Sequence, residues 1–152
     1  KYHLELIKKM PKGTTFDNQV LALIFNATTI ASIAQNASSS PLTNLYIALH
    51  TADPTASGNQ SSNEATYTNY ARVAVARTSG GWTVSGNQAS NTALIQFPQC
   101  GASGNTVTHV SIGTASSGAG QLLYTGALSS SLAVSNLIQP QFAIGALVVQ
   151  ET

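Results

Sequence analysis

Charge is what this sequence has least of. Only 7% of its 152 residues are Asp, Glu, Lys or Arg, whereas soluble domains have roughly 25%. Six Lys and Arg residues are too few to build the basic track that binds a phosphate backbone, which excludes a nucleic-acid partner. A net charge of +1 with 43% hydrophobic residues also argues against a disordered chain, because such chains combine low hydrophobicity with high net charge.

Cysteine and long apolar runs are scarce as well. The one cysteine, Cys100, excludes an internal disulfide framework and a multi-cysteine metal site. The most apolar segment, residues 20–33, is interrupted by Asn and Thr and is shorter than the roughly 20 residues of a membrane span. We therefore expect no membrane partner. No secretory signal is evident, and a single thiol is compatible with assembly in a reducing cytoplasm.

The charges that are present lie mostly in the first half of the chain. Four of the six basic residues fall within the first twelve positions, and no Asp, Glu, Lys or Arg occurs from Thr78 to Gln150. Charged side chains are a common means by which β-proteins avoid association. The neutral half has two interpretations: a sheet with Ser and Thr on its solvated face, or a surface that partner proteins cover.

The length suits one domain. We expect a basic N-terminal arm and a helix within residues 1–40, and a β-sandwich domain over residues 41–152 that forms one compact unit. Apolar residues return at the helical period between Asp17 and Gln35, which predicts a helix there with Asp17 as its N-cap. The Asn-Ala-Ser-Ser-Ser-Pro run at residues 36–41 is typical of a turn that stops a helix.

After Pro41 the pattern changes to short strands. Turn signals recur roughly every 8–12 residues, which is typical of an all-β sandwich or barrel. The fold class that we predict is mainly β: an antiparallel, jelly-roll-like β-sandwich with one N-terminal helix. The predicted strands cover residues 45–50, 67–77, 82–84, 93–97, 107–112, 122–128, 132–134 and 142–149.

The sequence offers little catalytic chemistry. Asp53 and Glu64 are the one conceivable glycosidase-type pair, but both fall in a polar loop where solvated carboxylates are the norm. His50 and His109 lie on predicted strands, where a histidine most often bonds to a neighbouring loop; a metal site with Asp53 would lack regular spacing. No nucleophile elbow or phosphate-binding loop is present. We predict no enzyme, no catalytic or metal-binding residue, and no cofactor.

The basic residues are the candidate contacts to partner proteins. Arg72 and Arg77 flank a predicted strand, and five positions apart they point to opposite faces. One is expected to pair with Glu64 or Asp53 and the other to reach a partner; protection of a sheet edge is the alternative. The candidate partner-contact residues are Lys8, Lys9, Lys12, Arg72 and Arg77.

Seven sequence blocks follow one another along the chain: LYIALHTADP at residues 45–54, NEA at 63–65, YARVAV at 70–75, IQFP at 95–98, VTHVSIG at 107–113, GQLLYTGAL at 120–128 and FAIGAL at 142–147. In this order they resemble a family of tailed-bacteriophage structural proteins. The likeness covers most of the chain from Pro41 onward, and the segment from Met10 to Gln35 is similar to members with an N-terminal helix. No block is diagnostic alone, but their order and spacing are specific together.

The resemblance implies a virion protein without a catalytic motif. Members are often labelled tail fibre proteins, and some resemble jelly-roll cement, or decoration, proteins on icosahedral capsids. The first expectation is therefore a cement protein on the capsid surface, which binds the major capsid protein and copies of itself as a dimer or trimer. The alternatives are a tail-fibre or baseplate component, and a carbohydrate-binding β-sandwich in which Trp82, Tyr67 and Tyr70 stack on sugar rings.

Overall fold

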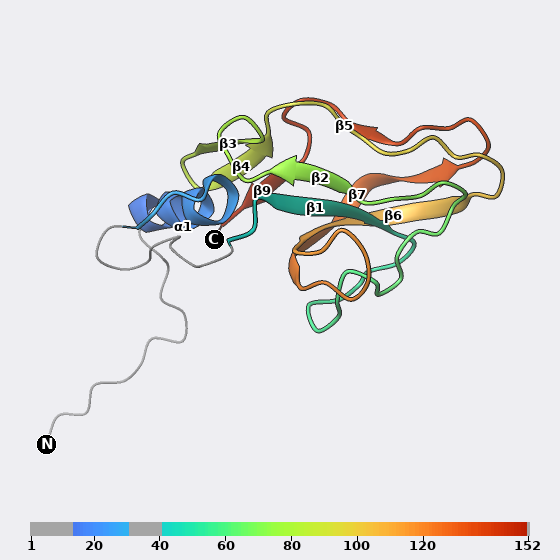
Figure 1. Ribbon diagram of the computed structural model, residues 1–152, viewed down its shortest axis with the longest axis horizontal. Coiled ribbons are helices and arrows are strands. Elements are labelled where there is room, and N and C mark those ends of the chain that lie inside the picture. Colours follow the sequence, from blue (N-terminus) through green and yellow to red (C-terminus); the bar gives the residue numbers. More distant parts are fainter. Residues whose placement is uncertain (1–13, 31–40, 152) are drawn as a thin grey trace, which may run out of the picture.

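A computed structural model describes residues 14–30 and 41–151 (Figure 1). Within these described residues, one helix is followed by nine strands in chain order. Most strands are short, as expected where turn residues recur every few positions. The elements are α1 (Thr14–Asn26), β1 (Asn44–His50), β2 (Val73–Ala76), β3 (Trp82–Ser85), β4 (Gln88–Asn91), β5 (Ile95–Gln96), β6 (Asn105–Gly113), β7 (Leu122–Val134), β8 (Gln141–Phe142) and β9 (Val148–Gln150).

The strands form three antiparallel sheets. The largest has the order β2-β1-β6-β7, a second has the order β3-β4-β9, and β5 pairs with β8. The pairs between these described strands are all antiparallel. The predicted class, mainly β with antiparallel sheets and one N-terminal helix, is confirmed. The division at residue 40 stays a prediction.

The helix is shorter than predicted and begins earlier. It starts at Thr14, so Asp17 lies in its first turn and is not the N-cap. It ends at Asn26 because Ala27 adopts a left-handed φ of 54°, a common conformation just past a helix end. The Thr28 amide donates to the Ala22 carbonyl at 3.0 Å. No helix among the described residues is long and apolar enough to cross a membrane.

The strand predictions need correction at three places. The expected strand at residues 67–77 is reduced to β2, because Asn69 has a φ of 76° and residues before Val73 form a turn. Residues 88–91, for which no strand was predicted, form β4 between β3 and β9. The sequence here is polar, but Ala89 and Asn91 alternate inward and are buried. Likewise the predicted last strand is two short strands, β8 and β9, separated by a turn at Gly145.

One hydrophobic core joins the helix to all three sheets. Figure 1 shows α1 at one end of the molecule beside β3 and β4. Leu21 and Phe25 of the helix are fully buried, and the Phe25 ring lies 4.6 Å from that of Trp82. Aromatic pairs at this separation contribute to stability beyond the burial of their area. The helix therefore packs on its own sandwich.

Candidate functional site

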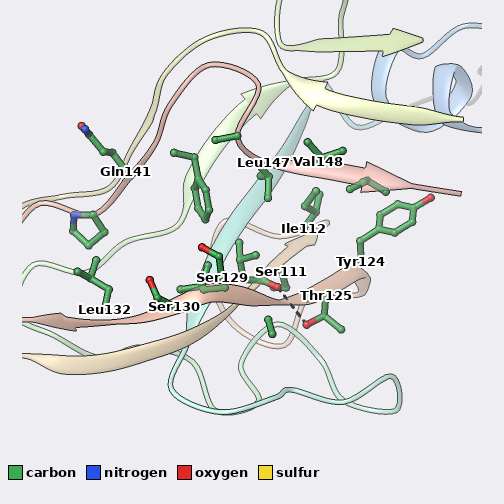
Figure 2. A pocket seen from close by; sticks show the side chains of 18 of the residues that line it. Ser111, Ile112, Tyr124, Thr125, Ser129, Ser130, Leu132, Gln141, Leu147 and Val148 are labelled. Atoms are coloured by element: carbon green, nitrogen blue, oxygen red, sulfur yellow. Dashed lines mark hydrogen bonds between the residues drawn. The ribbon is translucent and has the colours of Figure 1, made fainter. Parts of the chain in front are cut away.

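A concave groove lies beside β7. It has a volume of about 700 Å³ and lies between β6 and β7 on one side and the chain segment 140–150 on the other. Figure 2 shows Leu132 and Gln141 at one end of it, on opposite sides, and Tyr124 and Val148 toward the other end. Strands β7 and β9, which line it, are both outer strands of their sheets.

The groove is neutral. None of the described residues that line it is Asp, Glu, Lys or Arg. Leu132 and Val148 line its rim while 38% and 48% exposed. At one end the Tyr124 hydroxyl donates to Glu151 Oε1 at 2.7 Å, and burial raises the pKa of that phenol well above its ordinary value. The groove suits an uncharged, partly apolar occupant rather than an ion.

A second cluster binds two loops to each other. Glu64 accepts from Arg72 Nε at 2.6 Å and from Arg72 Nη2 at 2.7 Å. The same guanidinium donates to the carbonyls of Ala115 and Gly118. The Arg72 side chain is only 2% exposed, and hydrogen bonding to Glu64 raises the pKa of its guanidinium. The expectation that one arginine pairs with Glu64 is therefore confirmed for Arg72.

Gln60 and Tyr70 extend this cluster. Gln60 is fully buried; its Oε1 accepts from the Ala115 amide at 2.9 Å and its Nε2 donates to the Tyr46 carbonyl at 3.2 Å. The Tyr70 hydroxyl donates to Glu64 Oε1 at 2.9 Å, and burial raises the pKa of its phenol. Figure 1 shows the two loops, residues 51–66 and 114–121, side by side below the large sheet in this view. Sequence reasoning missed Gln60, because its partners are distant in the chain.

His50 lies beneath these loops and is fully buried. Its Nδ1 lies 2.9 Å from the Ser62 carbonyl, so Nδ1 carries the proton, and its Nε2 accepts from the Ser111 hydroxyl at 2.7 Å. Burial lowers the pKa of the imidazole below its ordinary value of 6.5, against the opposing effect of the Ser62 carbonyl. A serine and a histidine in contact here form a buried structural pair, since Ser111 is 1% exposed.

The buried imidazole predicts a pH dependence of stability. Well above pH 6.5, His50 is neutral in both the folded and the unfolded chain. As the pH falls through 6.5, the imidazole of the unfolded chain binds a proton, whereas the buried imidazole of the folded chain stays neutral. Stability is thus lost as the pH falls from 6.5, by at most about 1.4 kcal/mol per pH unit until the folded-state pKa is reached. Urea unfolding at pH 7.5 and 5.5 measures this. His50→Asn should flatten the slope and His109→Asn should retain it; an equal slope in His50→Asn and the parent would contradict the assignment.

Arg77 binds the end of the helix. Its Nε donates to the Ile24 carbonyl at 2.6 Å and its Nη2 to the Leu23 carbonyl at 2.8 Å. Nη1 donates to the Leu42 carbonyl at 2.8 Å. A cation beside the last carbonyls of a helix is favourable, while burial lowers the pKa of the guanidinium. Arg72 and Arg77 thus make contacts within the chain, and their role toward partners stays a prediction. Lys8, Lys9 and Lys12 lie outside the described residues.

The aromatic residues expected to stack on sugars belong to the core. Trp82 is 0% exposed and Tyr67 2% exposed, and Tyr70 packs against the same cluster. Burial raises the pKa of the Tyr67 phenol to about 12, and its hydroxyl donates to the Pro98 carbonyl. The sugar-stacking hypothesis based on these three rings is wrong, because β3 turns Trp82 onto Phe25 instead of toward solvent.

The remaining titratable residues have local structural contacts. The Asp53 carboxylate accepts from the Thr55 amide at 2.8 Å, and Glu64 is bound by Arg72. His109 lies opposite His50 in the β1–β6 register, with Nδ1 2.8 Å from the Thr108 hydroxyl. Across residues 14–30 and 41–151, no three or more His, Cys, Asp or Glu gather as a metal site would require. Cys100 is buried.

Comparison with known families identifies the class of protein. The model of the family described as podophage GP4 fiber I protein gp80 matches residues 14–150. The chain belongs to this family. No curated protein resembles the chain closely enough to count as a relative. As a member of a phage fibre protein family, the chain is a virion structural protein and not an enzyme.

The fibre family corrects the first expectation. The resemblance to tailed-phage structural proteins is confirmed at that level, but the family description names a fibre and not a capsid cement protein. It therefore supports the alternative, a fibre component of the virion.

Proposed function

We propose that the chain is a structural subunit of the phage's fibre whose uncharged half packs against neighbouring virion proteins, further copies of itself among them. The observation that carries this is the neutral groove beside β7, within the stretch from Thr78 to Gln150 that has no charged residue. Interface cores are depleted in charge because a desolvated, unpaired ion is costly. A surface that only met water would gain solubility from charge.

Many copies of a subunit in one assembly can act through weak contacts. Linked sites on a symmetric structure raise the overall strength of binding without any new contact. The family description, a podophage fibre protein, supports this place in the virion. Contact with the major capsid protein, which the cement hypothesis requires, stays a prediction that the experiment below also tests.

Electron microscopy of intact virions tests the proposal. Gold-labelled antibody against the purified chain should mark the fibres, in numbers set by the few fibres on each particle. An antibody against the shell protein is the control, because it should mark the capsid uniformly. Label spread over the capsid would contradict the fibre role and support the cement hypothesis, and particles without any label would contradict both.

A further inference from the structure

We propose that the groove beside β7 binds a second copy of this chain, with the two β7 strands antiparallel about a two-fold axis at Ser130. The inference rests on the proposed function and names the partner of the same groove. It has four supports: the exposed edge of β7, the neutral lining of the groove, its apolar rim, and the order of residues along the strand.

The edge of β7 is long and carries none of the usual features that block association. Among the described strands, β7 pairs with β6 alone. It runs through thirteen residues without charge or proline. Natural edge strands are usually short, or carry lysine or proline, because an open edge is a template for another strand.

One irregularity interrupts the pairing with β6. In the register, Val107 faces Leu132 and His109 faces Ala127, so four residues of β7, 128–131, face only Thr108. Extra residues of this kind disrupt the local pairing and bend the bulged strand. A bulge can itself guard an edge, so the experiments below include a monomer as an outcome that overturns the proposal.

The groove selects an uncharged occupant with apolar side chains. Leu132 and Val148 on its rim are 38% and 48% exposed. Burying them in a partner surface is favourable, and a charged partner would lose its hydration without gaining a counter-ion. The β7 strand of a second copy has this chemistry: it is neutral and carries Leu128 and Leu132 four positions apart.

The sequence of β7 makes it complementary to itself. Residues 127–133 read Ala-Leu-Ser-Ser-Ser-Leu-Ala, which is the same in both directions about Ser130. In an antiparallel pair centred there, Leu128 faces Leu132 of the second copy and Ser129 faces Ser131. Each of these facing pairs joins two side chains of the same type, and each pair occurs twice, once on either side of the two-fold axis. An unrelated partner would not need this symmetry.

A cysteine at the axis tests the register. Ser130→Cys places two thiols directly opposite, and facing residues of antiparallel strands have the Cα separation that a disulfide needs. Mild oxidation of the full chain should give a covalent dimer. Ser79→Cys, at an exposed turn between β2 and β3, is the control and should stay monomeric; Cys100 is buried and free in both variants. The absence of a dimer from Ser130→Cys would overturn the proposed axis.

Charge substitutions test the facing pairs in solution. Ser129→Lys and Ser131→Glu alone should each weaken self-association by roughly tenfold, because each buries an unpaired charge twice. Combined, they place a lysine opposite a glutamate in both symmetric pairs, so association should recover. Sedimentation velocity across a concentration series measures this. A double variant as weak as the sum of the singles, or a parent chain that stays monomeric, would overturn the two-fold pairing.

Virions carrying Ser130→Cys separate this inference from the proposed function. Gold label on fibres with a chain–chain cross-link supports both. Label on fibres with a cross-link to a different virion protein leaves the fibre role intact and overturns the second copy as occupant. A dimer of purified chain with no label on the fibres would keep the pairing and contradict the fibre role.

Discussion

Replacing Arg72 with methionine is expected to lower the free energy of unfolding by about 3 kcal/mol, one of the two largest effects that we predict. Methionine keeps much of the apolar stem but removes the guanidinium. That leaves the Glu64 carboxylate, whose side chain is 16% exposed, without its ion pair. It also frees the carbonyls of Ala115 and Gly118, to which Arg72 donates. The partial exposure of Glu64 places the loss at the lower end of the range for broken buried pairs.

Urea unfolding at pH 7.5 measures the effect, and a lowering of the midpoint temperature by roughly 10 °C should accompany it. The matched control is the double variant Arg72→Met with Glu64→Gln. The second substitution removes the unpaired Glu64 carboxylate, so the double variant should be more stable than Arg72→Met alone. The interpretation fails if the double variant is the less stable of the two, because Glu64 would then not depend on Arg72 for its neutralisation.

Replacing Phe25 with alanine is expected to cost about 3–5 kcal/mol. Phe25 is 0% exposed and packs against Trp82 and Tyr124, with ring centroids 4.6 and 5.7 Å away. The substitution opens a cavity where α1 meets the sheets, which relax only partly around it. Trp82 is the one tryptophan of the chain, so its fluorescence reports on the same site and should shift to longer wavelength as water enters.

Phe16→Ala is the matched control for Phe25→Ala. Phe16 lies on the same helix and is 37% exposed, so its loss should stay within about 1 kcal/mol. Similar losses in the two variants would mean that α1 does not share the core of the sandwich.

The helix and the first strand show which element boundaries can be predicted from the sequence alone. The alternation in LYIALH at residues 45–50 predicts β1 almost to the residue, because side chains two positions apart lie on the same face of a strand, and Leu45, Ile47 and Leu49 are buried. The start of the helix was missed, since Asp17 is a good N-cap residue by type but is 7% exposed inside the first turn. Its end was missed because Ala27 gives no local sign of its left-handed conformation.

The site was predictable only in outline. The absence of charge after Thr78 indicated a surface for partners, and the groove lies within that stretch. The contacts of Gln60, His50 and Ser111 join residues far apart in the chain, and a sequence pattern does not show which distant residues meet. For the same reason the sequence alone offers Trp82 as a sugar-stacking residue, although it packs on a helix more than fifty residues earlier.

A reconstruction of the fibre at side-chain detail tests the central claim most directly. If the neutral half is the interaction surface, residues buried between this chain and its neighbours should fall mainly between Thr78 and Gln150, with the β7 groove filled and few ion pairs across the contact. An interface built on charged residues before Thr78, with the β7 groove open to solvent, would contradict it.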